Sequence, residues 1–180
     1  MKAYIQKTRW LYIVAAIIVI LDQVSKALVR NLIPEGSFWS PWSWLAPYVR
    51  LFHISNTGVA FGMFQGKSPL FAILAAIVVV AIIYYYPQIP SQDKVLRFAL
   101  AMQLGGALGN LIDRVFQGGQ VTDFISVGNF FVFNVADSFI TVGVIVLLIG
   151  IWLEDKREKA QKKLATSLEQ PADDLNRSNP

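Results

Sequence analysis

Carboxylates in unusual positions are the first feature of this sequence that points to chemistry. Four of its twelve acidic residues lie inside apolar stretches or at their ends: Asp22, Asp113, Asp123 and Asp137. A charged side chain at the centre of a membrane helix costs about 2.5–3.5 kcal/mol on insertion scales, so such carboxylates are functional-site candidates. Their surroundings indicate which of them perform the chemistry.

Asp123 and Asp137 are the strongest pair. They bracket the junction between a loop and an apolar stretch, and neither has a basic neighbour in sequence. Two close carboxylates share one proton, because ionising both is costly. The pair then holds a base that activates water and an acid that protonates a leaving amine. This chemistry is peptide-bond hydrolysis by an aspartic dyad.

Amides and cations accompany the carboxylates at helical spacing. Asn110 lies three residues before Asp113, as Asn134 lies before Asp137, and each pair is expected to share a helix face. Arg114 lies four residues after Asn110. For Asp113 and Arg114, an interfacial clamp at a helix end is favoured over direct chemistry.

Asp22 and Lys26 are also four residues apart, and two interpretations of this spacing stay open. They form an internal ion pair that lets a polar face enter the bundle, or they support the site. Gly105 and Gly109 make a small-xxx-small face that allows close helix packing.

The composition predicts the elements that position these residues. Of 180 residues 54% are hydrophobic and only 16% are charged, whereas soluble domains carry about 25% charged residues. A helix needs roughly 20 apolar residues to cross a bilayer. Four stretches approach or exceed that length, at residues 10–29, 69–86, 95–112 and 130–153. The fold class is therefore an all-α integral membrane protein with four transmembrane helices.

Local signals refine this picture. Ser68 is expected to cap the second helix, with Pro69 at its first position and Tyr84 to Tyr86 in an interfacial belt. Residues 30–68 form the longer outer loop, whose tryptophans are expected at the membrane surface. After Pro47, residues 48–54 read as a short strand, so the outer region is expected to contain a little β-structure.

The basic residues predict the orientation. Ten of them fall on one side of a four-span model and four on the other, and the richer side is cytoplasmic. Both termini are therefore expected inside, and the carboxylates in the outer half of the membrane. Residues 1–155 are predicted to form one transmembrane unit, followed by a charged cytoplasmic tail at residues 156–180.

Composition also excludes several functions. The chain has no cysteine and a single histidine, which rules out cysteine nucleophiles and most zinc chemistry. Its basic residues form no single stripe, which disfavours nucleic-acid binding. A small proton- or ion-coupled transporter is the main alternative, but it predicts carboxylates at the midplane of repeated halves. A helix scaffold is another alternative. A Ser25–Lys26 peptidase is disfavoured because adjacent residues face different sides of a helix.

Five blocks of the sequence resemble the bacterial lipoprotein signal peptidases (signal peptidase II), in that family's order and topology. Together they extend from the first apolar stretch to the fourth. Val59 is one departure, since many members have alanine there. The blocks are LDQVSK at 21–26, NTGVAFG at 56–62, GGALGNLIDR at 105–114, VTDF at 121–124 and FNVADS at 133–138.

The resemblance implies an enzyme of the bacterial inner membrane that removes signal peptides from diacylglyceryl-modified prolipoproteins, cutting just before the lipidated cysteine. It implies blockage by globomycin, contact with membrane lipids, and no metal or organic cofactor. It assigns the roles as follows: catalysis to Asp123 and Asp137; substrate binding to Asn56, Asn110, Arg114 and Asn134; and support of the site to Asp22, Lys26 and Asp113.

Overall fold

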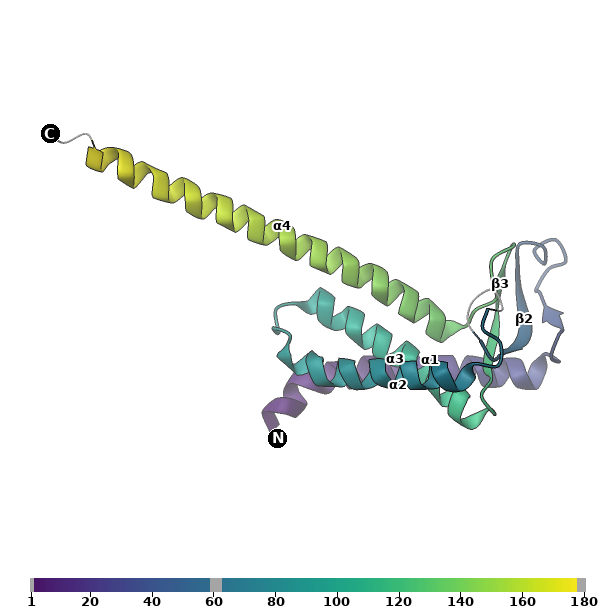
Figure 1. Ribbon diagram of the computed structural model, residues 1–180. Helices are drawn as coiled ribbons and strands as arrows, with labels where there is room; N and C mark the ends of the chain where they lie inside the picture. The colour runs from purple at the N-terminus through teal and green to yellow at the C-terminus, as the bar shows by residue number, and fades with distance from the viewer. Residues whose placement is uncertain (1, 59–62, 178–180) are drawn as a thin grey trace.

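Four long helices and a small sheet make up the protein (Figure 1). The computed structural model describes residues 2–58 and 63–177, with side chains from 7 to 165. Val59 to Gly62, the second part of the NTGVAFG block, lie outside the described residues. The four predicted spans are confirmed, because every helix holds a stretch long and apolar enough to cross a membrane. The helices are α1 (Lys2–Leu32), α2 (Ser68–Tyr85), α3 (Lys94–Phe116) and α4 (Val135–Arg177).

Helix α3 is the centre of the bundle and packs against the other three helices. Half of its most apolar stretch is buried, a larger share than in any other span. The predicted glycine face makes this packing possible: a Cβ atom on Gly105 would lie 2.7 Å from the Cβ of Ile18 in α1. A Cβ atom on Gly106 would lie 2.6 Å from the carbonyl oxygen of Ala136 in α4.

Two predictions at the ends of α2 were wrong in detail. Lys67, not Ser68, is the N-cap; Ser68 is already helical and its buried hydroxyl makes no hydrogen bond within the described chain. At the other end, Tyr84 and Tyr85 are exposed as expected, but Tyr86 is only 1% exposed. The chain turns there into the short 3-10 helix η2 (Tyr86–Gln88), which directs the Tyr86 ring into the bundle core.

Helix α4 starts at Val135, five residues later than predicted. Phe133 is extended instead and forms an isolated bridge with Ile125. Apolar side chains alone do not distinguish an extended segment from a helix over so few residues. Asn134 is therefore the residue just before α4 and does not share a helical face with Asp137.

The sheet has three antiparallel strands, β1 (Phe38–Trp39), β2 (Val49–Asn56) and β3 (Val121–Val127), in that order. Only β2 was predicted, at nearly its observed bounds. Strand β3 was missed because most of its residues are buried, so the alternation typical of a half-exposed strand is weak. The strands run across the ends of the helices (Figure 1).

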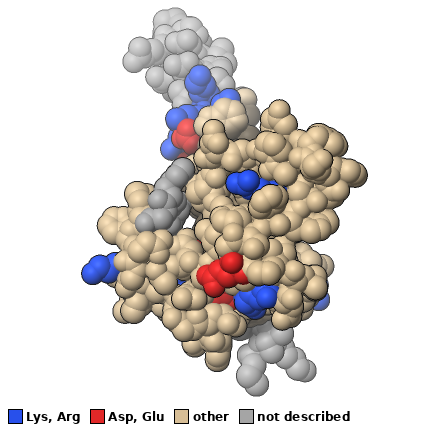
Figure 2. Space-filling model, turned by 90° about the vertical axis from the view of Figure 1, so that its right-hand side faces the viewer, with Lys and Arg blue, Asp and Glu red and all other residues tan. Residues whose placement is uncertain are grey.

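The two ends of the bundle differ in character. The sheet covers one end, and both chain termini lie toward the other (Figure 1). Seen from the sheet end, the surface is largely uncharged, with few charged side chains (Figure 2). A small core of Val29, Ile33 and Phe124 joins α1 to β3. The sheet is thereby fixed to the bundle at the end where the carboxylates lie.

Candidate active site

Asp137 is held by the start of α4. The side-chain oxygen of Asn134 accepts a hydrogen bond from the Asp137 amide at 3.0 Å, and Asp137 Oδ2 accepts one from the Asn134 amide at 3.2 Å. This reciprocal arrangement is a capping box, in which residues three apart satisfy each other's free amides. The carboxylate also lies in the first turn of α4, where the helix dipole favours negative charge.

Asp123 is held by the sheet. It lies on β3 opposite Ile54 of β2, while Asn56 is opposite Val121. Asn56 and Asp123 are thus diagonal neighbours on one face of the pair, within reach of each other. The Asn56 amide donates a hydrogen bond of 2.9 Å to Asp123 Oδ2. Its own oxygen accepts a bond from the Gly58 amide, which fixes the side chain.

Two asparagine amides connect the carboxylates. Asn134 Nδ2 donates to Asp123 Oδ1 at 2.7 Å and to Asn110 Oδ1 at 3.1 Å. Asn110 Nδ2 donates to Asp137 Oδ1 at 2.7 Å. Each carboxylate therefore accepts hydrogen bonds from neutral amides, and neither has an ion pair within the described chain. This arrangement holds both groups in place without neutralising them.

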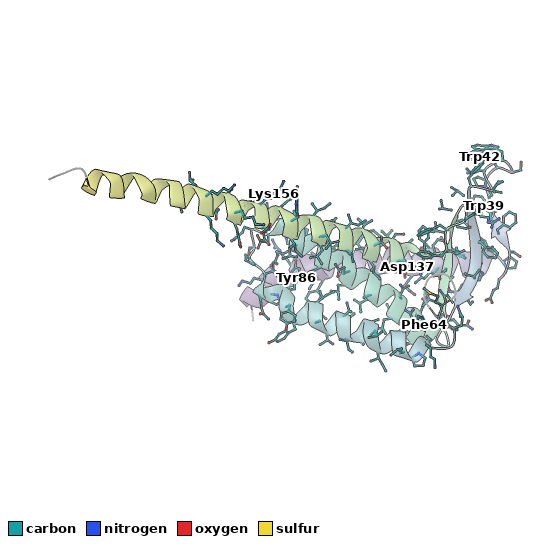
Figure 3. All side chains as sticks on the ribbon, turned by 45° about the horizontal axis from the view of Figure 1, so that its top comes forward. Trp39, Trp42, Phe64, Tyr86, Asp137 and Lys156 are labelled. Atoms are coloured by element: carbon teal, nitrogen blue, oxygen red, sulfur yellow. The ribbon has the colours of Figure 1, made fainter. Side chains whose placement is uncertain are left out.

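Both carboxylates line one cavity of about 210 Å³. Asp137 lies in the half of the bundle nearer the sheet (Figure 3). Its lining combines polar groups with apolar side chains, so a peptide backbone and its side chains would both find partners. The lining residues are Asn56, Gly58, Asn110, Arg114, Val121, Asp123, Phe131, Val132, Asp137, Ile140 and Thr141.

The pKa of Asp123 is raised to about 7, mainly by burial and then by the negative charge of Asp137. Hydrogen bonds from Asn56 and Asn134 and the positive charge of Lys26 oppose this shift. The side chain is 3% exposed, so loss of hydration dominates. Near neutral pH this carboxyl group therefore holds a proton far more readily than an exposed aspartate does.

Behind the cavity, Asp22, Lys26 and Asp113 form a buried ion cluster. Lys26 Nζ lies 2.8 Å from Asp22 Oδ2 and 3.2 Å from Asp113 Oδ2, and all three side chains are fully buried. The same ammonium group donates to Asn110 Oδ1 at 3.0 Å. The predicted Asp22–Lys26 ion pair is thus present. Asn110 connects the cluster to Asp137, because it accepts a hydrogen bond from Lys26 and donates one to Asp137.

The ion cluster also ties four elements to one another: α1, α3, α4 and β3. Asp22 accepts a hydrogen bond of 2.9 Å from the Ala136 amide at the start of α4. Asp113 accepts one of 3.1 Å from the Thr122 amide in β3. Both elements that carry the paired carboxylates are therefore positioned by charges from α1 and α3.

Arg114 points in a different direction from Asp113 and lines the cavity. Its guanidinium group contacts the carbonyl oxygens of Asn110 and Gly58, each at 3.4 Å, and lies 5.8 Å from the Phe71 ring centre. Its buried Nε has no hydrogen-bond partner within the described chain. No Asp113–Arg114 clamp forms, because adjacent helical residues face different directions.

The structure separates the predicted site residues into two sets. Asp123, Asp137, Asn56, Asn110 and Arg114 line the cavity. Asn134, Asp22, Lys26 and Asp113 lie behind it and are completely buried.

Sequence reasoning missed several neighbours of these residues. Gln23 bridges α1 and α3 by donating to Asp22, to the Gly109 carbonyl and to Asp113. Phe131 and Thr141 line the cavity. Thr141 was detectable, because it lies four residues after Asp137 and so on the same helix face.

The fold and the site together define a multi-pass membrane protein with a carboxylate pair in a cavity at one end of its bundle. Residues 14–153 match the family model described as signal peptidase (SPase) II, or Peptidase_A8. The chain therefore belongs to the signal peptidase II family of aspartic peptidases.

Individual relatives agree with this assignment. The lipoprotein signal peptidase of Halalkalibacterium halodurans is 40% identical over 155 residues, which cover 84% of this chain and 97% of the relative. That of Staphylococcus aureus is 31% identical, with 84% of this chain and 93% of the relative covered. A bacterial membrane enzyme solved at 2.3 Å resolution superposes with a TM-score of 0.74 at 31% identity, covering 83% of this chain and 90% of the other. Membership of a peptidase family disfavours the transporter alternative.

Proposed function

We propose that the protein is an intramembrane aspartic endopeptidase that releases signal peptides from diacylglyceryl-modified prolipoproteins, cutting just before the lipidated cysteine. One observation carries the mechanism: buried Asp123 and half-buried Asp137, joined through Asn134 and without ion pairs in the described part of the chain, line a single cavity. The names of the relatives indicate lipoprotein precursors as the substrate class.

The reaction follows from the sharing of one proton. The ionised carboxylate takes a proton from water, which attacks the scissile carbonyl carbon. The protonated carboxyl group then gives its proton to the leaving nitrogen as the C–N bond breaks. Arg114 Nε has no hydrogen-bond partner among the described residues and can donate to a substrate carbonyl. Asn56 lies beside Asp123 at the cavity wall. Asn134 is too deeply buried to contact substrate, so we assign it the role of positioning both carboxylates.

The position of the cavity fits a substrate that is anchored in the lipid bilayer. Ile140 and Thr141 of α4 line its side toward the membrane span, where the signal helix would approach. A second cavity of about 260 Å³ shares Asn56, Phe131 and Val132 with the first and includes Ile54 and Ser55 of β2. The chain that follows the cysteine would leave along this second cavity.

The orientation and the organisation of the chain belong to the same proposal. The sheet end faces outward in the bacterial inner membrane, both termini are cytoplasmic, and globomycin occupies the cavity. Residues 1–155 form the peptidase unit and residues 156–180 a cytoplasmic tail. The excess of basic residues at the end opposite the sheet supports this orientation.

Cleavage of a diacylated prolipoprotein by the purified protein tests the function. Asp123→Asn and Asp137→Asn are each expected to lower kcat by about 100- to 10,000-fold, the usual contribution of a general acid or base. Asp155→Asn, which removes an exposed ion pair with Lys159 at the end of the peptidase unit, is the matched control and keeps wild-type activity.

Three results would count against the proposal. The wild-type protein could fail to cleave the precursor, or both Asp123→Asn and Asp137→Asn could remain active. A precursor that lacks the diacylglyceryl group could also be cleaved as fast as the diacylated one. Thermal unfolding of each variant, recorded in the same detergent, separates loss of chemistry from loss of fold. A scaffold role predicts altered stability with no cleavage by any form of the protein.

A further inference from the structure

A third cavity, with a distinct chemistry, lies at the end of the bundle away from the sheet. It has a volume of about 390 Å³ and lies between the first part of α1, η2 and the first turns of α3. Tyr86, which lies near this end, marks its position in Figure 3. The lining residues are Trp10, Val14, Tyr86, Ser91, Lys94, Arg97, Phe98 and Ala101. None of them takes part in the proposed reaction.

Arg97 provides a fixed positive charge at this cavity. Its guanidinium group lies 4.2 Å from the centre of the Tyr86 ring and donates hydrogen bonds to the carbonyl oxygens of Ile89 and Lys7. The side chain is half-buried, yet no carboxylate lies within ion-pair distance of it in the described part of the chain. The charge is held in place and is not neutralised.

Other charges around the cavity reinforce this positive character. Lys94 also lines it, and Lys7 and Arg9 belong to the adjoining turns of α1. Asp93 and Glu154 do not line this cavity but a neighbouring one on the α4 side, which Lys94 also borders. The wall formed by the first turns of α3 is therefore cationic.

The remaining walls are apolar and aromatic. Trp10 and Phe98 are more than half exposed, and Val14 and Ala101 complete this part of the surface. Tyr86 is 1% exposed, and it contributes an aromatic ring to the inner part of the cavity wall. A bound group that matches this cavity carries negative charge and acceptor oxygens at one end and hydrocarbon at the other.

We infer that this cavity binds one anionic glycerophospholipid. Its phosphate lies between Lys94 and Arg97, and the first part of an acyl chain runs along Trp10 and Phe98. A zwitterionic lipid fits less well because its headgroup brings a cation to a region that already has unpaired cations. Basic pockets between membrane helices recognise anionic headgroups by this charge complementarity. The inference does not depend on the proposed peptidase reaction.

Native mass spectrometry of the full-length protein tests this site. The protein is purified in detergent and mixed with equal amounts of phosphatidylglycerol and phosphatidylcholine that have the same acyl chains. Wild type is expected to retain one phosphatidylglycerol molecule in preference to phosphatidylcholine. Lys94→Gln is expected to weaken this binding about fivefold, since a cation near an anionic lipid surface contributes about 1 kcal/mol.

Lys156→Gln is the matched control. It removes the same charge at the same end of the molecule (Figure 3), but Lys156 lies over Trp152 of α4, outside the cavity. We expect its lipid binding to equal that of wild type. Because Lys94 is exposed, Lys94→Gln should unfold at the wild-type temperature in lipid-free detergent, which shows that the fold is intact.

Phe98→Ala tests the apolar wall and is expected to weaken phosphatidylglycerol binding while all cations remain. Glycerol phosphate, which has no acyl chain, should displace the lipid poorly. The site is overturned if both lipids are retained equally, or if Lys94→Gln and Lys156→Gln weaken binding to the same extent. Displacement by glycerol phosphate at equal concentration would also overturn it.

Discussion

At the scale of single residues, the carboxylate pair depends on neutral partners. Asp123 and Asp137 accept hydrogen bonds from Asn56, Asn110 and Asn134, while the nearby Lys26 is directed at other carboxylates. An adjacent cation would hold both groups ionised and leave no proton for the leaving nitrogen. Amides orient the carboxylates and still allow one proton to be shared.

This arrangement predicts the pH dependence of cleavage. The pKa of Asp123 is about 7, so the shared proton leaves the pair as the pH rises through that value. The kcat/KM for a lipidated precursor is then expected to fall about tenfold per pH unit above pH 7, because the acid is lost. A pH profile of kcat/KM measures this decrease at alkaline pH, the alkaline limb of the profile. Its midpoint is an apparent pKa of the coupled Asp123–Asp137 pair.

Replacement of Asn56 tests the assignment of that limb. Asn56→Ala removes a hydrogen bond that favours the charged form of Asp123, so the pKa of Asp123 rises and the alkaline limb moves to higher pH. Ser55→Ala alters the neighbouring residue of β2 and should leave the limb in place. A limb that moves to lower pH in Asn56→Ala would contradict the role given to this amide.

At the scale of the elements, buried charges join α1, α3, α4 and β3. Asp22 accepts a bond from the start of α4, Asp113 accepts one from β3, and Lys26 binds both carboxylates. Removing one member of such a cluster leaves uncompensated charge in the interior, at a cost of about 3–5 kcal/mol.

Lys26→Met should therefore lower the free energy of unfolding by about 3–5 kcal/mol. Lys159→Met is the control, because it breaks an exposed pair with Asp155 that contributes about 0–1 kcal/mol. Denaturant unfolding in detergent compares the two. Equal losses would show that the ion cluster has no special role in joining the elements.

Glycine spacing in α3 sets how closely the helices approach. A Cβ atom on Gly109 would lie 2.6 Å from Asp22 Oδ2 and 3.2 Å from the Cβ of Ala136. Gly109→Ala is expected to cost about 1–3 kcal/mol by overpacking and to lower cleavage, because it displaces Asp22.

Gly150→Ala provides the comparison for this prediction. Its Cβ atom would meet Val95 Cγ1 at 3.3 Å, a side-chain contact that can relax, and alanine favours the helix. Its unfolding free energy should stay near that of wild type. A thermal shift that is as large in Gly150→Ala as in Gly109→Ala would contradict the packing argument.

At the scale of the whole molecule, the two ends carry different chemistry. The sheet end holds the carboxylate pair in a largely uncharged surface. The opposite end carries basic side chains, the termini and the cationic cavity. A bilayer separates these ends, so the orientation decides which compartment each one meets.

Because the chain has no cysteine, single introduced cysteines report its orientation cleanly. Glu35→Cys, in the loop after α1, is expected to react with a membrane-impermeant maleimide in intact spheroplasts. Gln161→Cys, on α4 beyond the bundle, is expected to react only after lysis. Both side chains are exposed, so accessibility depends on the membrane alone. The reverse pattern would invert the proposed orientation.

Much of the fold was predictable because its signals are local. The four helices follow from apolar stretches, and β2 from its branched and aromatic residues after Pro47. The start of α4 was predicted too early, because the phenylalanines before Asn134 continue the apolar pattern of the helix. One of them, Phe133, instead pairs with Ile125 of β3. Tyr86 was misplaced because a turn of the backbone, which its residue type does not indicate, directs its ring inward.

By itself, the sequence determined that the chain is a membrane protein and which carboxylates are exceptional, because burying charge in an apolar stretch is costly wherever it occurs. Only the tertiary structure decided their partners. Asn56 and Asp123 are 67 residues apart and meet through the register of β2 and β3. Asn134 links the two carboxylates because Phe133, just before it, pairs with β3, and α4 begins just after it. Its side chain therefore contacts both Asp123 and Asp137. Strand register and helix docking are cooperative, long-range outcomes, so local spacing identifies the reacting groups but not the geometry that holds them.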